Sequence, residues 1–428
     1  MPEKQRQARI GWCLYDWANS AFATVILAAV LPVYFVALVP EDGAIIGVGS
    51  WQHTLPASAL WGYAVSGSML IVAVIGPWLG ALADHRGLRK QFLVAFCLVG
   101  SFATSLLYLT SHGQYLTAAA LFIIGNIGFS AGNIFYNAYL AILVKPGGTD
   151  RLSAQGFATG YIGGGIVLLA VFLLIQFSDQ LGFADKGAAT RLGFLFTGLW
   201  WALFALPAFF LLPKTDPSSR TKANPFRTYL NSFKDMIRYR DLSLFLLAFL
   251  FYNDGIQTVI AVSAIFAREE LALSQGTILG CFLMIQFAAM PGALLFGRIA
   301  DRFGAKQAIL LSLFLFTLVC GYAYTMRSSL EFWVLGAVIA LILGGSQAIS
   351  RSLFASMVPI KRSAEFFGFY SISARFASIF GPLTFALVTD LTGSSRGAIL
   401  ALAIFFVIGG GILLLVNVDR GRIRAVQN

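Results

Sequence analysis

The chain has 428 residues, of which 58% are hydrophobic and only 11% are Asp, Glu, Lys or Arg, and its formal net charge is +11. Soluble domains average about 25% charged residues, so this composition excludes an ordinary soluble protein and indicates that most of the chain lies in lipid. At about 20 residues per membrane-spanning helix, the length leaves room for about 12 helices joined by short loops.

The apolar runs predict an all-α membrane protein of 12 transmembrane helices in two pseudo-symmetric six-helix bundles. The first set of runs covers 12–38, 59–83, 91–110, 115–143, 151–177 and 192–212. The second set covers 242–267, 275–299, 307–326, 331–357, 363–389 and 395–416. We therefore predict an N-terminal six-helix bundle over 1–213, a linker over 214–241 and a C-terminal six-helix bundle over 242–428.

The linker contains one segment with helical periodicity. Asn224 and Pro225 suit the N-cap and the first helical position. Apolar residues then follow at helical spacing among basic ones, at Phe226, Tyr229, Leu230, Phe233 and Ile237. This pattern predicts an amphipathic helix on an anionic membrane surface. A calmodulin-type target and a lipid sensor would carry the same pattern, so both stay open beside a plain surface-lying linker.

A short charged motif occurs twice, each time between two apolar runs. Residues 80–90 read GALADHRGLRK and residues 297–307 read GRIADRFGAKQ. In each copy the first glycine lets a neighbouring helix approach closely, and the last glycine suits a turn with positive φ. We predict that these loops form a gate, built from Gly80, Asp84, Gly87, Arg89, Lys90, Gly297, Asp301, Arg302 and Gly304.

The distribution of cations predicts the orientation of the chain. Most of the 30 Lys and Arg residues fall in the linker and in loops on the side that also holds both termini. Cytoplasmic loops carry this excess of Lys and Arg, so we predict that both termini are cytoplasmic and that the protein lies in the plasma (inner) membrane. The same distribution argues against nucleic acid as the partner of the basic residues.

The two halves also resemble each other outside the loop motif. Residues 151–157 (RLSAQGF), at the start of the fifth span, resemble residues 362–367 (RSAEFF), at the start of the eleventh. Together with the two loops, the linker and the helix count, this pattern resembles the major facilitator superfamily over the whole chain. More narrowly, residues 15–22 (YDWANSAF) and 156–164 (GFATGYIGG) are similar to the "unknown major facilitator" family.

The resemblance implies a fold and a function. Eukaryotic relatives of that family include the autophagy-related vacuolar amino-acid effluxers, so the resemblance implies a transporter of two bundles that works as a monomer and without a cofactor. His85 stands where the superfamily usually has Arg, and the fourth span lacks the Arg of many proton-coupled members. These departures argue against simple drug/proton exchange.

Ionisable residues inside the spans are the first candidates for a binding site, because such residues are costly in lipid and usually face a cavity. Asp254 falls near the middle of the seventh span and Arg375 near the middle of the eleventh. One interpretation is a structural ion pair; the other is that Arg375 binds a substrate carboxylate and Asp254 a substrate ammonium. Asp254 and Asp16 are the candidate proton carriers.

The fourth span carries a polar stripe at helical spacing, formed by Asn126, Ser130, Asn133 and Asn137. It either joins helices or lines a cavity. The full set of predicted substrate-binding residues is Asp254, Arg375, Asn253, Gln257, Asn126, Asn133, Asn137, Tyr136, Asn19 and Gln347. Asp16 and Arg351 lie nearer the cytoplasmic ends of their spans, where snorkelling or pairing in an inner gate is favoured over substrate contact. Glu365, at the start of the eleventh span, is a predicted gate or loop partner.

The leading hypothesis is a secondary active transporter that uses alternating access to export a small polar solute, such as an amino acid or related zwitterion, with protons as the coupling ion. An exporter of an amphiphile and a transport-inactive receptor stay open. No span shows a nucleophile–base pair, and His53, His85 and His112 lie in loops without ligand spacing. We therefore expect neither an enzyme nor a metal site.

Overall fold

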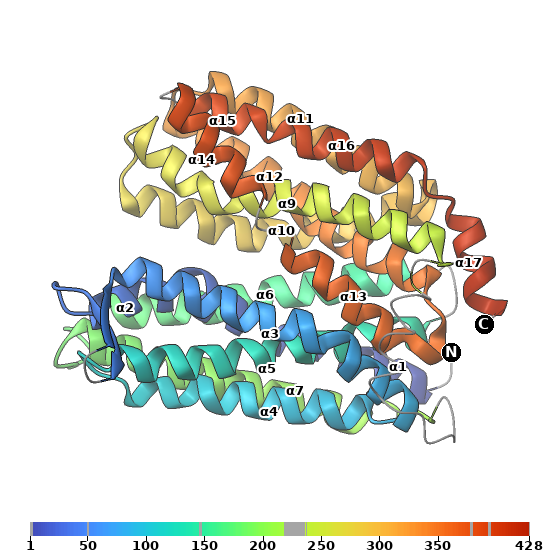
Figure 1. Ribbon diagram of the computed structural model, residues 1–428, viewed down its shortest axis with the longest axis horizontal. Coiled ribbons are helices and arrows are strands. Elements are labelled where there is room, and N and C mark those ends of the chain that lie inside the picture. Colours follow the sequence, from blue (N-terminus) through green and yellow to red (C-terminus); the bar gives the residue numbers. More distant parts are fainter. Residues whose placement is uncertain are drawn as a thin grey trace. The chain divides into compact units, whose positions relative to one another are not determined.

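The computed structural model describes residues 3–48, 51–144, 148–217, 236, 238–376, 380–392 and 395–427. Most of these residues are helical (Figure 1). Long helices satisfy every backbone polar group within one segment, which is the requirement that lipid imposes on a spanning chain.

The helices of the first half cover the predicted spans, although α1 begins before the predicted start at 12 and α7 before the predicted start at 192. They are α1 (Glu3–Ala21), the π-helix η1 (Phe22–Ala29), α2 (Leu31–Leu38), α3 (Ala57–Arg86), α4 (Arg89–Leu106), the short 3-10 helix η2 (Leu107–Leu109), α5 (Tyr115–Leu143), α6 (Thr149–Gln176) and α7 (Lys186–Leu211). The predicted first span is bent by 46° between Glu3–Ala29 and Leu31–Leu38. The Val30 amide donates to the Val25 carbonyl at 2.9 Å, the five-residue spacing of a π-helix.

The second half continues in the same way. It contains α9 (Arg240–Glu269), α10 (Gln275–Phe303), α11 (Ala305–Thr325), α12 (Ser329–Met357), the 3-10 helix η3 (Ile360–Arg362), α13 (Ser363–Phe376), α14 (Phe380–Thr392), α15 (Ser395–Ala401), α16 (Ala403–Leu414) and α17 (Val418–Gln427). Ser328 and Glu331 form a capping box at the start of α12, which stabilises the first turn by satisfying amides that have no helical partner.

Among the described residues, ten helices are long and apolar enough to span a membrane, and the bent pair in the first span makes an eleventh. The predicted span 363–389 is covered by α13 and α14, on either side of residues 377–379, which lie outside the described residues. The structure is therefore consistent with 12 spans. The predicted amphipathic helix of the linker falls on residues 218–235 and 237, which also lie outside them.

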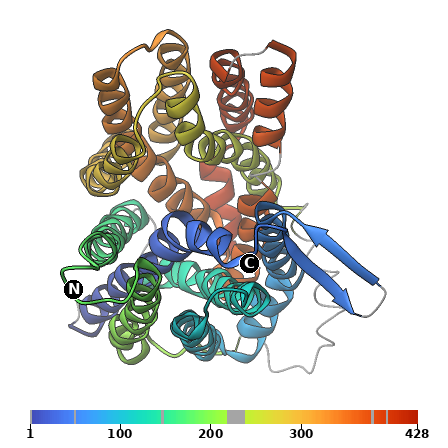
Figure 2. The ribbon, with the colours of Figure 1, turned by 90° about the vertical axis from the view of Figure 1, so that its left-hand side faces the viewer.

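A β-hairpin follows the first span and was not predicted. Strand β1 (Ala44–Val48) pairs antiparallel with β2 (Trp51–Leu55), with Ile46 opposite His53. Figure 2 looks along the helices and shows the two strands standing beside them. The Tyr115 hydroxyl, at the start of α5, bonds both the amide and the carbonyl of Ile45 at 3.0 and 3.2 Å. One side chain thus satisfies both main-chain groups of Ile45 on the edge of β1 that does not pair with β2.

The chain forms two compact units. The first contains Met1–Ile75, Leu88–Tyr136 and Thr159–Thr215, and the second contains Gly76–Gly87, Asn137–Ala158 and Asp216–Asn428. The second unit therefore joins the helices of the second half with one end each of α3, α5 and α6. The six-helix bundle boundaries drawn from the sequence stay a prediction.

Two glycines of α6 allow that helix to lie directly against α1 in the first unit. A Cβ on Gly160 would lie 2.6 Å from the Ser20 Oγ and 3.1 Å from the Asp16 Oδ1, and a Cβ on Gly163 would overlap the Trp17 carbonyl. Close approach of backbones is the usual role of small residues in membrane helices.

Replacing Gly163 with alanine is expected to lower the thermal stability of the purified protein, because the new methyl group would collide with the α1 backbone rather than with a movable side chain. Gly67→Ala in α3 is the matched control, since a Cβ there meets no atom within 4 Å. Thermal unfolding in one detergent measures both. Equal unfolding temperatures for the two variants would contradict this interpretation of the glycines.

Candidate functional site

Asp16 belongs to a buried polar network in the first unit. Its side chain is 7% exposed, and the Tyr136 hydroxyl of α5 donates to its Oδ2 atom at 2.9 Å. The Tyr136 ring stacks on Trp12 and Tyr15, with centroids 4.5 and 5.0 Å apart. The Trp12 indole also donates to the Tyr136 carbonyl at 2.9 Å. The carboxylate is therefore held by aromatic rings that cannot easily move.

Asn19 lies one turn beyond Asp16 on the same face of α1. Its Nδ2 donates to the Asn133 Oδ1 of α5 at 3.0 Å. The Asn19 Oδ1 atom is buried and has no hydrogen-bond partner among the described residues. An unsatisfied buried acceptor is costly, so this oxygen is suited to accept a hydrogen bond from a ligand.

The polar stripe of α5 divides among three neighbours. Asn126 donates to the Ser68 hydroxyl of α3 at 2.7 Å, and Ser130 donates to Asn126 at 3.4 Å. Asn133 faces α1, as described above, whereas Asn137 accepts from Arg351 of α12 at 3.3 Å within the second unit. Asn126 therefore joins α5 to α3, and Asn133 joins α5 to α1 through Asn19.

Asp254 lies at the centre of α9 and is 1% exposed. Its carboxylate accepts hydrogen bonds from the backbone amides of Phe380 and Gly381 at 3.1 and 3.0 Å. These are the first two described residues of α14, so Asp254 supplies an anionic acceptor to two neighbouring main-chain amides. Arg375, its predicted partner, lies in α13, and its side chain is outside the described part of the structure.

Three other predicted binding residues lie on α9 and α12. The Asn253 amide, 4% exposed, reaches the Ala374 carbonyl at 3.5 Å, the long limit of a hydrogen bond. Gln257 of α9 and Gln347 of α12 are both half-buried. Their positions as substrate ligands stay a prediction.

The first copy of the loop motif contacts the start of α13. Asp84 is 3% exposed, and its carboxylate accepts from the amides of Ala364 and Glu365 at 3.3 and 3.0 Å. A Cβ on Gly80 would overlap the Ala364 carbonyl, so only glycine permits this approach. The Glu365 carboxylate in turn binds the Arg362 guanidinium at 2.6 and 2.9 Å.

The second copy of the motif differs, although its sequence is similar. Asp301 is exposed, whereas a Cβ on Gly297 would lie 2.7 Å from the Ala154 Cβ of α6. A different carboxylate, that of Asp150 at the start of α6, makes the contact with α12, where it accepts a hydrogen bond from the Ser352 hydroxyl. The equivalent glycines therefore pack alike, but the equivalent aspartates do not.

Arg351 of α12 is buried against α5 and α6, with 4% of its surface exposed. Its Nε and Nη2 atoms donate to the Oγ and the carbonyl of Ser153, both at 2.9 Å. Its guanidinium carbon lies 4.1 Å from the Phe157 ring centroid, within cation–π range. The snorkelling interpretation is wrong, because the charged group is enclosed by protein.

The remaining motif residues shape the turns and cap helices. Gly87 and Gly304 have positive φ values of 68° and 97°, as predicted. Lys90 donates to the Leu212 carbonyl at 2.7 Å, at the end of α7, and so interacts with the negative end of a helix.

Lys306 has the same role in the second half, donating to the Leu414 and Val416 carbonyls at 2.8 and 2.9 Å. Arg89 is buried, whereas Arg302 is exposed and lies 5.3 Å from the Phe303 ring.

Sequence reasoning missed several residues of these clusters. Asp150, Ser153 and Phe157 of α6 all contact α12, and Trp12 and Tyr15 of α1 hold Tyr136. Residues 150, 153 and 157 share one helix face. That spacing was the available signal, but nothing in the sequence indicated which helix the face would meet.

Comparison with known proteins agrees with the fold. The family model described as "Vacuole effluxer Atg22 like" matches residues 4–426. An "Uncharacterized MFS-type transporter YxiO" from Bacillus subtilis is 37% identical over 415 residues, covering 95% of this chain and 94% of the relative. "Autophagy-related protein 22" from Coccidioides immitis is 25% identical over 531 residues, covering 96% and 87%.

Solved structures of transporters have the same fold. The proton:xylose symporter XylE superposes with a TM-score of 0.70 at 15% identity, covering 96% of this chain and 94% of that one. The transporter FucP in its outward conformation superposes with a TM-score of 0.74 at 12% identity, covering 96% and 98%. This chain therefore belongs to the Atg22-like vacuole effluxer family and is a multi-pass membrane transporter with the major facilitator fold.

Proposed function

We propose that this protein exports a small polar solute, an amino acid or a related zwitterion, by alternating access coupled to protons. One observation carries the proposal. The buried Asp16 carboxylate and the Asn19 Oδ1 atom, which has no hydrogen-bond partner among the described residues, lie one turn apart on one face of α1. A buried carboxylate and a buried amide oxygen one turn apart are both acceptors, and they suit the donors of a substrate ammonium.

Asp16, rather than Asp254, is the proposed centre of ammonium recognition and proton transfer. The Asp254 carboxylate accepts two backbone amides, which cannot give up or take a proton during transport, whereas Asp16 accepts a hydrogen bond from the Tyr136 hydroxyl. An acid that exchanges its proton during transport must keep a partner that can donate or accept, and a tyrosine hydroxyl does both. Arg375 stays a predicted substrate-binding residue.

The proposed gate, called here the gate cluster, is formed by the contacts of Asp84, Asp150, Ser153, Arg351, Ser352 and Glu365. It holds the ends of α3 and α6 against α12 and α13. We place this gate on the cytoplasmic side, with both termini, in the plasma membrane and in a monomer. The excess of Lys and Arg in the loops on that side supports the orientation, and the efflux activity in the family's description supports the direction of transport.

An exporter of an amphiphile is the second candidate function. Export of a lipid or a drug would need an apolar route, whereas the Asp16 network presents two buried acceptors. A transport-inactive receptor would lack substrate-driven turnover. A direct transport assay separates all three.

Substituting Asp16 with asparagine is expected to reduce amino-acid transport at least tenfold and to remove its dependence on the pH gradient, because the amide carries no negative charge and cannot gain or lose a proton as a carboxyl group does. Proteoliposomes containing the full-length protein are loaded with a mixture of labelled amino acids, and efflux is followed with and without a pH gradient. Tyr136→Phe, which removes the hydroxyl but keeps the ring, is expected to show a smaller loss.

Tyr34→Phe is the matched control. This substitution also removes one partly buried hydrogen bond, from the Tyr34 hydroxyl to the Thr110 carbonyl at 2.8 Å, but that bond does not involve Asp16. Transport by Asp16→Asn at the parental rate would refute the site, and absence of amino-acid efflux by the parent, with export of a fluorescent lipid or dye, would favour the amphiphile.

A further inference from the structure

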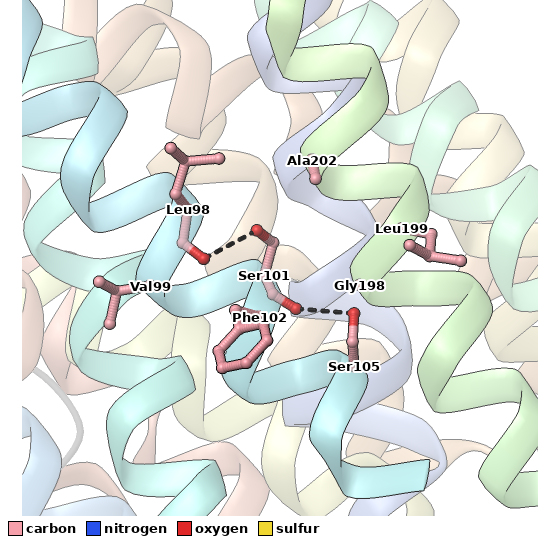
Figure 3. Close-up of a pocket in the computed structure, with 8 residues that line it drawn as sticks. All are labelled: Leu98, Val99, Ser101, Phe102, Ser105, Gly198, Leu199 and Ala202. Carbon is pink, nitrogen blue, oxygen red and sulfur yellow. Dashed lines mark hydrogen bonds between the residues drawn. The ribbon is translucent and has the colours of Figure 1, made fainter.

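An apolar groove runs between α4 and α7 in the first unit, on the surface of two spanning helices (Figure 3). Its volume is about 450 Å³, and it is open to the outside. The lining comes from both helices and consists of Leu98, Val99, Ser101, Phe102, Ser105, Gly198, Leu199 and Ala202.

Small residues make the groove. A Cβ on Gly198 would lie 2.6 Å from the Ser101 carbonyl, so the two helices cross almost backbone to backbone at this point. Ser101 and Gly198 form the buried floor, while large apolar side chains stand at the rim: Leu98 is 46% exposed, Phe102 is 65% exposed and Leu199 is 56% exposed. The hollow is therefore built by the close crossing and bordered by apolar walls.

The groove offers a ligand almost no polar contact. Its two hydroxyls are engaged by their own helix, since Ser101 donates to the Leu98 carbonyl at 3.2 Å and Ser105 donates to the Ser101 carbonyl at 3.0 Å (Figure 3). A polar solute entering the groove would lose hydration without compensation. An apolar chain would lose nothing and would gain contact with both walls.

The position of the groove decides the source of that apolar chain. Residues 98–105 lie about 14–24 Å along α4 from its start, at 1.5 Å per residue, and Gly198 lies at the middle of α7. This depth is inside the hydrocarbon layer. Further along α7, Phe210 is another exposed apolar side chain.

We propose that the groove between α4 and α7 is a binding site for one acyl chain of a membrane phospholipid. The chain lies along the helix crossing, contacts the Ser101–Gly198 floor and is bordered by Leu98, Phe102 and Leu199. The site is separate from the Asp16 network and independent of the transported solute. Its occupant fills the hollow that the close crossing of the two helices leaves between their rim side chains.

A photolabelling experiment tests the proposal. The full-length protein is reconstituted into vesicles of phosphatidylcholine that contain a small fraction of phosphatidylcholine with a diazirine on one acyl chain, and adducts are mapped by peptide mass spectrometry after illumination. Labelling of residues 98–105 and 198–202 is expected to exceed, at least fivefold, labelling at equally exposed positions of α11 such as Phe314 and Leu318. Uniform labelling would overturn the proposal.

A filled-groove variant provides the second arm. Ala202→Phe places a ring in the hollow and is expected to reduce labelling of α4 at least fivefold, whereas Leu203→Phe, one position along and 61% exposed, is expected to leave it unchanged. Unfolding temperatures of both variants are measured in parallel, so that only folded protein is compared. Undiminished labelling of folded Ala202→Phe would also overturn the proposal.

Discussion

Replacing Arg351 with alanine is expected to slow transport at least tenfold and to loosen the gate cluster. The substitution removes three hydrogen bonds to Ser153 and Asn137 and the contact with Phe157. Loss of a buried charged donor costs about 3 kcal/mol, which corresponds to about a hundredfold shift between the closed and open states of the gate.

Hydrogen exchange in nanodiscs measures the closed state directly. Amides of residues 150–157 and 348–356 are expected to exchange faster in Arg351→Ala than in the parent, because these two segments lose their shared contacts. Arg351→Lys keeps the charge but lacks the forked donor, so it is expected to recover only part of the protection. Arg298→Ala, an exposed cation of α10, is the control. Unchanged exchange in Arg351→Ala would show that the gate cluster does not depend on this side chain.

Replacing Asp254 with alanine is expected to destabilise the protein by about 3 kcal/mol even without substrate, since the Phe380 and Gly381 amides lose a shared anionic acceptor. Asp254→Asn keeps one acceptor oxygen, so its free energy of unfolding is expected to fall by less than that of Asp254→Ala. Thermal unfolding of each variant, with and without an amino acid that stabilises the parent, measures the effect. Asp419→Ala, an exposed acid of α17, is the control.

This experiment also separates two roles for Asp254. A residue that holds the Phe380 and Gly381 amides lowers the unfolding temperature of the substrate-free protein when it is replaced. A residue that binds substrate would leave that temperature unchanged and abolish only the stabilisation by ligand. The second outcome would return Asp254 to the centre of the substrate site and weaken the case for Asp16.

Much of the fold was predictable, because helices in lipid need long apolar runs and little else. The predicted spans 115–143 and 331–357 coincide with α5 and α12 within two residues. The β-hairpin at 44–55 was not predicted, since it depends on Tyr115, a residue about 60 positions further along the chain. The π-helix at 22–29 was also missed, because the same apolar letters are compatible with either helix.

The candidate site was predicted less well than the fold. Asp16, Asn19, Asn133 and Tyr136 were all identified as polar residues in spans, but their mutual contacts were not. Asp254 and Arg375 were paired because they are opposite charges at similar depth, and this pairing stays a prediction because the Arg375 side chain lies outside the described residues. The structure adds the backbone amides of Phe380 and Gly381 as partners of Asp254. Backbone amides occur at every residue except proline, so residue identities could not indicate these partners.

By itself the sequence determined that this is a helical membrane protein with a duplicated architecture, because hydropathy and the repeated loop motif are local properties of the chain. Only the tertiary structure decided how the duplicated parts differ: Asp84 is buried against α13, while Asp301 is exposed and Asp150 bonds Ser352 instead. The physical reason is that a hydrogen bond depends on which helix end lies within 3 Å of a carboxylate, and two copies of one motif meet different neighbours.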